Sequence, residues 1–168
     1  MITIGFLELN SISKGILAAD EMIKAADIAL IAARPSCPGK YQILITGEVS
    51  SVEAALDAGQ AASSSNVIDR LILPRIHPQV VEAINMSSAP ERLRALGVME
   101  FFSVTAAILA ADAAAKAADV DLLEIRLGTG IGGKSFVTMT GDVSAVTASV
   151  DAGIKSAEGT GMVLDSVV

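Results

Sequence analysis

The first residues of the chain combine a short apolar run with an amphipathic stretch. Residues 2–9 are rich in apolar and β-branched side chains, which predicts a strand. Ser11 follows as a candidate N-cap, whose side chain accepts a hydrogen bond from the first turn of a helix. The apolar positions after it are spaced by four and three residues, which predicts one face of a helix: Ile12, Ile16, Ala19, Ile23 and Ala26.

The rest of the first half continues this alternation. Three further apolar runs predict strands at 28–33, 40–46 and 67–73. Ser50 and Glu53 have the spacing of a capping box and predict the start of a second helix, and residues 77–84 predict a short additional one. The order strand, helix, strand, strand, helix, strand is typical of a ferredoxin-like α+β fold, in which helices cover one face of a four-stranded antiparallel sheet.

The second half of the chain repeats the first. Residues 5–36 align with 97–128, and 14 of these 32 positions are identical. Residues 39–59 align with 133–153, and 11 of these 21 positions are identical. Agreement at this level indicates a duplicated domain. The separation between equivalent residues grows by two between the blocks, which predicts a longer loop in the second copy.

The duplication predicts the domain organisation. We expect a first domain at residues 1–86, a linker at 87–95 and a second domain at 96–168. The helical stripe of the first copy recurs in the second at Val104, Ile108, Ala111, Ala115 and Ala118. The fold class is therefore two tandem ferredoxin-like α/β domains.

The composition favours a protein that associates with other copies. Hydrophobic residues make up 52% of the chain and the mean hydropathy is +0.58, although only 3% of residues are aromatic. No apolar stretch reaches the ~20 residues of a membrane span, and no signal peptide is visible, so we expect a cytoplasmic location and no membrane. Because small domains bury a modest share of their surface, the surplus apolar surface predicts a subunit interface. An ordinary alanine-rich globule is the alternative.

Charge and reactive side chains narrow the function classes. The net charge is −7, from 12 basic and 19 acidic residues, which disfavours nucleic-acid binding. The single cysteine, Cys37, excludes an intrachain disulfide and fits a reducing compartment. No Ser-His-Asp set or metal-binding histidine spacing occurs, and Glu8 and Glu100 are repeat equivalents rather than an acid pair. We therefore expect no enzyme activity.

A glycine-rich segment at 128–135 matches both a Walker A phosphate loop and G-x-G-x-x-G. Those motifs bind phosphate only where a helix leaves the loop, whereas the residues after Ser135 alternate like a strand. We therefore expect a tight loop between two strands. Gly130, Gly132 and Gly133 permit unusual backbone angles and close approach of another chain.

The counterpart of this loop in the first copy, Arg34–Lys40, contains Cys37 between two prolines. A lone cysteine is usually a small buried hydrophobe, but an exposed cysteine in a rigid turn can bind a metal or react. One thiolate cannot hold a metal cluster alone, whereas a threefold axis would bring three together.

Four basic residues lie at the ends of predicted elements. Lys24 and Lys116 end the first helix of each copy, where a lysine suits the helix dipole and is otherwise solvated. Arg75 and the single histidine, His77, follow the fourth strand and fit a surface contact better than catalysis.

Several of these segments together resemble the bacterial microcompartment (BMC) shell domain, and two such domains in one chain resemble the tandem, trimer-forming class. The resemblance covers residues 2–168 and rests on the following segments: Gly5-x-x-Glu8, Ala19–Asp27, Cys37–Lys40, Gly47–Val52, Ile76–Pro78 and Gly130–Lys134.

The resemblance implies that three chains form a pseudohexameric homotrimer, one tile in the shell of a protein organelle. It implies partners among other shell proteins and enclosed redox enzymes, and tile-edge contacts at Lys24, Lys116, Arg75 and His77. It places two loops around a central pore, with these lining residues: Ser36, Pro38, Gly39, Lys40, Gly130, Ile131, Gly132, Gly133 and Lys134.

The resemblance also implies that Cys37 from three subunits binds a [4Fe-4S] cluster on the threefold axis, a group usually held by thiolates, for electron transfer across the shell. Two alternatives remain at this stage. The tile could have an open metabolite pore without a cluster, or the chain could be a ferredoxin-like regulatory or ligand-binding oligomer.

Overall fold

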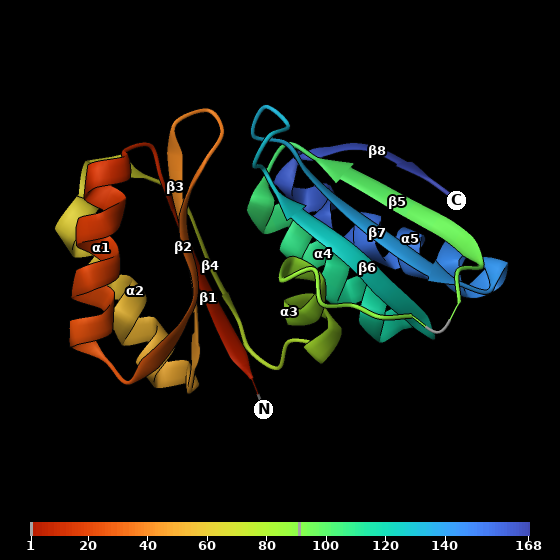
Figure 1. Cartoon of the computed structure of the whole chain (residues 1–168), viewed down its shortest axis with the longest axis horizontal. Helices are drawn as coiled ribbons and strands as arrows, with labels where there is room; N and C mark the ends of the chain where they lie inside the picture. The colour runs from red at the N-terminus through yellow and green to blue at the C-terminus, as the bar shows by residue number, and fades with distance from the viewer. Residues whose placement is uncertain (1, 91) are drawn as a thin grey trace. The chain divides into compact units, whose positions relative to one another are not determined.

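The computed structural model describes residues 2–90 and 92–168, and these divide after Ile76 into two compact units. Apart from one additional helix at the start of the second unit, both units have the same order of strands and helices (Figure 1). The first unit contains β1 (Thr3–Leu9), α1 (Ile12–Ala25), β2 (Ile28–Ser36), β3 (Lys40–Gly47), α2 (Val49–Ser63), a 3₁₀ turn (Ser64–Asn66) and β4 (Val67–Leu73). The second contains α3 (Pro78–Ile84), β5 (Ala95–Phe101), α4 (Val104–Ala117), β6 (Val120–Leu127), β7 (Ser135–Gly141), α5 (Val143–Ala157), a 3₁₀ turn (Glu158–Thr160) and β8 (Val163–Val167).

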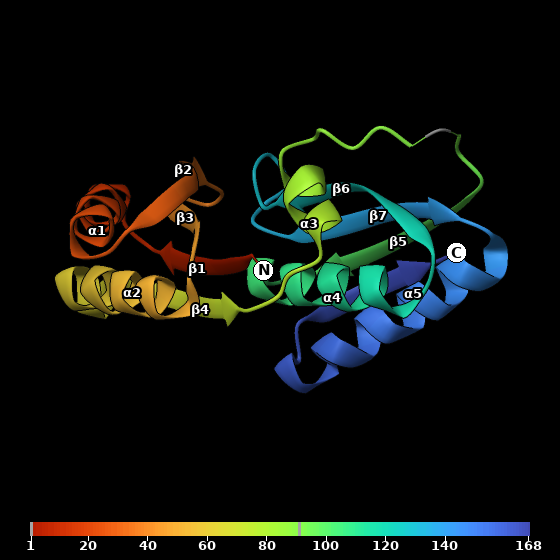
Figure 2. The ribbon, with the colours of Figure 1, turned by 90° about the horizontal axis from the view of Figure 1, so that it is seen from below.

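The sheets confirm the predicted ferredoxin-like fold. The strand order is β2-β3-β1-β4 in the first unit and β6-β7-β5-β8 in the second, and every neighbouring pair is antiparallel. Figure 1 shows α1 and α2 on one side of the first sheet. In the second unit, α4 and α5 lie on one side of the strands, while α3 lies beside β6 (Figure 2).

The core of the first unit lies between its sheet and its two helices. Leu7, Ile43 and Ile45 from the strands pack with Met22 and Leu56 from the helices. The corresponding core of the second unit contains Met99, Phe101, Val137, Met139 and Val146, all fully buried. Because side chains alternate between the two faces of a strand, the helix-facing residues of β1 and β3 fall at every second position.

The face of α1 that packs against the sheet is not the face that carries its isoleucines. Ser11 caps the helix as predicted, accepting a hydrogen bond from the backbone N–H of Lys14. The buried residues are mainly small: Gly15, Ala18, Ala19 and Met22. Ile12, Ile16 and Ile23 of the predicted stripe are instead 43%, 56% and 51% exposed.

The start of α2 and the end of β2 differ from the predicted limits. The helix α2 begins at Val49, with Glu48 at the N-cap and no side-chain cap, so Ser50 and Glu53 lie inside the helix and form no capping box. The short helix α3 packs against β6 and α4 and lies in the second compact unit, while its residues fall within the predicted first domain at 1–86. Strand β2 also extends to Ser36, beyond the predicted end at residue 33.

No helix within residues 2–90 and 92–168 is both long and apolar enough to cross a lipid bilayer.

Candidate functional site

The cysteine lies in the short turn between β2 and β3. Ser36 is buried at the end of β2, Cys37 is partly exposed, and Pro38 and Gly39 are exposed. The Cys37–Pro38 peptide bond is cis and Gly39 has a φ of +78°, a region that favours glycine. Cys37 is therefore a partly exposed residue in a turn between two strands, as expected of a ligand or a reactive group.

A partly buried ion pair supports the base of this turn. Lys40, the first residue of β3, donates a hydrogen bond of 2.9 Å from Nζ to Oε2 of Glu8. The amide of Gln42, which lies opposite Glu8 across the two strands, donates to Oε1 at 3.1 Å. Only 5% of the Glu8 side chain is exposed, so these two donors replace the water that a carboxylate otherwise binds.

The glycine-rich segment of the second unit connects β6 to β7. Gly128, Gly130, Gly132 and Gly133 all have positive φ, and the chain leaves the loop as β7 rather than as a helix. The structure therefore confirms a tight loop between strands. Because no helix N-terminus faces the loop, the geometry of a Walker A phosphate site is missing from residues 128–141.

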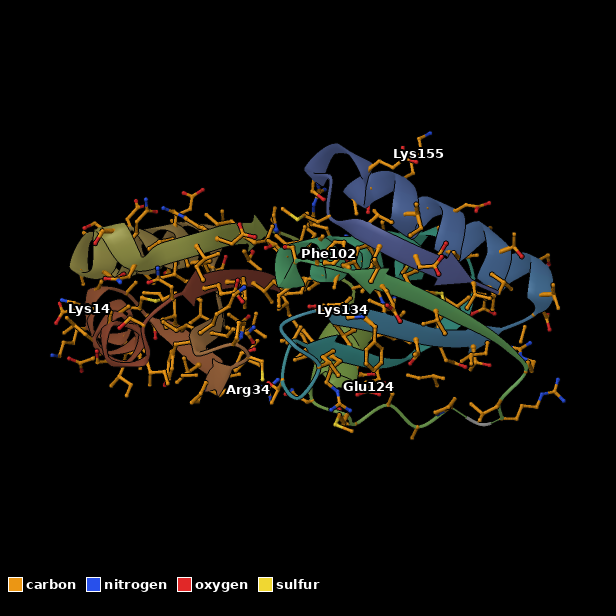
Figure 3. All side chains as sticks on the ribbon, turned by 90° about the horizontal axis from the view of Figure 1, so that it is seen from above. Lys14, Arg34, Phe102, Glu124, Lys134 and Lys155 are labelled. Atoms are coloured by element: carbon orange, nitrogen blue, oxygen red, sulfur yellow. The ribbon has the colours of Figure 1, made fainter. Side chains whose placement is uncertain are left out.

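The residues at the base of this loop differ from those in the first unit. Lys134 is 3.5 Å from Glu100, and 42% of the Glu100 side chain is exposed. Phe136 replaces Gln42, and the guanidinium of Arg126 lies over its ring at 5.9 Å. A cavity of about 180 Å³ lies here, lined by Glu100, Ile131, Lys134, Ser135 and Phe136. Figure 3 shows Lys134 at this end of the second unit.

Strand register confirms the predicted two-residue difference between the loops. Arg34 pairs with Gln42 in the first unit, and its equivalent Arg126 pairs with Phe136 in the second. Equivalent residues of β3 and β7 are thus 94 positions apart in the sequence, whereas those of β2 and β6 are 92 apart. The two additional residues lengthen the β6–β7 loop and leave the strand pairing unchanged. Each predicted pore loop therefore occupies the same place within its own unit.

The lysines that end α1 and α4 make the same intrahelical ion pair. Lys24 contacts Asp20 at 2.5 Å, and Lys116 contacts Asp112 at 2.5 Å, in each case across one helical turn. The hydrogen bond to Asp20, together with its charge, raises the pKa of Lys24 above its ordinary value of 10.5. A raised lysine pKa keeps the side chain cationic at neutral pH, and the charge is lost only in strongly alkaline solution.

The remaining predicted contact residues lie at the end of β4 and the start of α3. Arg75 is exposed in a turn with a φ of 58°. The backbone N–H of His77 donates to Oδ1 of Asp112 at 2.8 Å, so Asp112 connects His77 to Lys116. The sequence analysis predicts no role for Asp112. Its identity with Asp20 in the repeat is the one sequence feature that could have indicated such a role.

The described part of the chain contains no cluster of side chains that could hold a metal ion by itself. Among residues 2–90 and 92–168, no group of three or more histidine, cysteine, aspartate or glutamate side chains comes together. Cys37 is a free thiol. A polynuclear group at this position therefore requires thiolates from several chains.

Comparison with known proteins points to one family. Residues 3–76 and 95–168 each match the BMC domain. The chain is 38% identical to the bacterial microcompartment shell protein PduT of Citrobacter freundii over 161 residues, which cover 96% of this chain and 88% of the relative.

Solved structures agree with this similarity. A crystal structure of a microcompartments protein from Desulfitobacterium hafniense DCB has 51% identity and a TM-score of 0.95, covering 99% of this chain and 93% of the other. The fused permuted hexameric shell protein MSM0275 from the RMM microcompartment has 22% identity and a TM-score of 0.68, covering 94% and 82%. The latter likeness shows the shared fold.

We predict that Glu8→Ala lowers the free energy of unfolding by about 2 kcal/mol, because it leaves Lys40 and Gln42 without their buried acceptor. The matched substitution Glu100→Ala removes an exposed, longer contact and should cost less than about 1 kcal/mol. Urea denaturation of both variants measures the difference. Equal losses would contradict the structural role given to Glu8.

Proposed function

Because the chain belongs to the BMC domain family of microcompartment shell proteins, we propose that three copies close into a homotrimeric tile of six BMC domains. Each such pseudohexamer joins other shell proteins in the wall of an organelle in the bacterial cytoplasm. The role is structural rather than catalytic, and the tile separates enclosed enzymes from their surroundings.

The observation that carries this proposal is a difference between two equivalent helix faces. Ile12 and Ile16 on α1 are 43% and 56% exposed, whereas their equivalents Val104 and Ile108 on α4 are 2% and 0% exposed. Burying an aliphatic side chain of this size contributes about 1.5–3 kcal/mol. The open α1 face is therefore a costly surface in water, and a second copy of the chain is a natural partner for it.

A threefold ring fits this arrangement because it pairs unlike surfaces. A contact between the first unit of one chain and the second unit of the next joins two different surfaces. Such contacts produce a closed ring only when the rotation from chain to chain adds up to a full turn, and otherwise they produce a filament. Two domains in each chain give three chains the six positions of a hexagonal tile. The regulatory or ligand-binding oligomer is the other reading, and it would form no tiles.

We predict that the parent protein has three times the mass of one chain in solution and that Ile16→Glu has the mass of one chain. The glutamate would place a charge in the apolar contact and leave the fold unchanged. Lys14→Glu is the control, since Lys14 is exposed on another flank of α1 and extends from the first unit (Figure 3). Light scattering measures the masses, and a monomeric parent would refute the tile.

We also propose that Cys37 from three chains binds a [4Fe-4S] cluster on the threefold axis. The partly exposed thiol in the β2–β3 turn supports this, because thiolates are the usual ligands of such clusters. A bound cluster would supply one-electron transfer across the shell, to or from enclosed redox enzymes. The partly buried Glu8–Lys40 pair would fix the base of each turn.

Anaerobically purified protein should contain about four iron atoms per three chains and absorb visible light. We expect Cys37→Ser to lose both the iron and the absorbance while keeping the trimeric mass, since Cys37 packs in no core. Iron analysis and absorption spectra measure this. Iron retained by the variant would eliminate the cluster, and a trimer purified without iron would favour an open metabolite pore.

Contacts between tiles are the third part of the proposal. Lys24 remains cationic beside Asp20 and Glu21 at the exposed end of α1, where it can reach a neighbouring tile. Lys116 occupies the equivalent position, and Arg75 and His77 would contribute to the same edges.

We predict that Lys24→Ala reduces the formation of extended sheets and leaves the trimeric mass unchanged. The reason is that the substitution removes an exposed donor without altering a buried contact. Lys14→Ala on the same helix is the control. Electron microscopy of concentrated protein measures the arrays, and parent-like sheets from the Lys24 variant would contradict an edge role.

A further inference from the structure

The second unit contains a seat for the short helix α3, formed by Asp112 on α4 and Leu122 on β6. Asp112 accepts the backbone N–H of His77 at 2.8 Å, just before the first turn of α3. The side chain of Gln79 accepts the backbone N–H of Leu122 at 2.9 Å. Val80, Ala83 and Ile84 form the buried side of α3, which packs against β6 and α4. Two polar contacts and three apolar side chains thus define what this seat binds.

The first unit has the same residues at the equivalent positions. Asp20 and Leu30 correspond to Asp112 and Leu122, and both are identical between the copies. The irregular register of β6 next to Leu122 also recurs in β2, where pairing with β3 shifts between Leu30 and Ala32. The irregular backbone next to the seat is therefore duplicated together with these two residues.

The two seats differ in exposure. Leu122 is 1% exposed, but Leu30 is 43% exposed. The Asp112 side chain is 8% exposed and that of Asp20 is 55% exposed, although each binds the lysine one turn later through the same oxygen, Oδ2. The seat in the first unit thus has the same aspartate and leucine as the seat in the second unit, and α3 belongs to the second unit.

We infer that the seat at Asp20 and Leu30 binds a short amphipathic helix from another polypeptide, with the chemistry of α3. The partner segment begins with a free backbone N–H for Asp20, carries a side-chain acceptor for the Leu30 N–H, and follows these with aliphatic residues at the spacing of Val80, Ala83 and Ile84. Asp20 lies on the same helix, α1, as the exposed Ile12, Ile16 and Ile23.

Duplication supplies the reason for this occupant. The seat in the second unit shows that these side chains accept a helix of this kind with both polar groups satisfied. A buried donor or acceptor without a partner costs about 1–3 kcal/mol, so a segment lacking the acceptor is disfavoured. The seat in the first unit consequently favours helices that carry a side-chain acceptor at the right position as well as apolar residues.

The test uses a labelled synthetic peptide with the sequence of residues 74–86 and the full chain. Because isolated short helices are marginal in water, we expect weak, saturable binding, with a Kd on the order of 0.1–1 mM by fluorescence anisotropy. Leu30→Glu should weaken binding at least about tenfold. Leu164→Glu is the matched control, since Leu164 is a similarly exposed leucine at 39% on β8, and it should bind like the parent. A peptide with Gln79→Ala should bind about fivefold more weakly.

Two outcomes overturn the inference: no saturable binding to the parent chain, or equal binding by the Leu30→Glu variant, which would mean that the peptide binds elsewhere. Light scattering on the same samples separates this result from the proposed tile. A trimer that fails to bind the peptide refutes the helix seat alone, whereas a monomer that binds it refutes the ring alone.

Discussion

Close packing of helices on the sheets through small residues determines how the chain presents its apolar surface. A Cβ atom on Gly15 would lie 2.4 Å from the ring of Tyr41, and one on Gly59 would lie 2.6 Å from Met22. Glycine at these positions allows α1 and α2 to approach the sheet and each other more closely than larger residues would permit. Because α1 meets the sheet through its small residues, its isoleucines face outward and are exposed in the single chain, which leaves them available for the subunit contact proposed above.

Duplication preserved the backbone of each unit while local contacts diverged. The partly buried pair Glu8 and Lys40, with Gln42, contrasts with the exposed pair Glu100 and Lys134, where Phe136 stands in place of the amide. The thiol occurs in only one of the two turns. At its turn, one copy therefore has a partly buried ion pair, and the other has a longer glycine loop and an arginine over an aromatic ring.

Much of the fold could be predicted from the sequence, since periodicity, the repeat and the Ser11 cap are local signals. The features that were missed depend on tertiary contacts. Ser50 and Glu53 had the right spacing for a capping box, but the helix begins at Val49. The placement of α3 against β6 could not be read from residues 77–84, because its partners Asp112 and Leu122 lie far along the chain. Exposure of the α1 isoleucines was likewise invisible to periodicity, which identifies an apolar stripe without saying what covers it.

The unequal turns have a consequence for any assembly built around an axis. Six identical hairpins around an axis would place six copies of each ligand there, which is more than a [4Fe-4S] cluster can bind. Covalent linkage of two unlike hairpins breaks that sixfold equivalence and halves the number of donors. In the proposed trimer, one point mutation in the β2–β3 turn would change the surroundings of the axis at three symmetric places and leave the three β6–β7 loops unaltered.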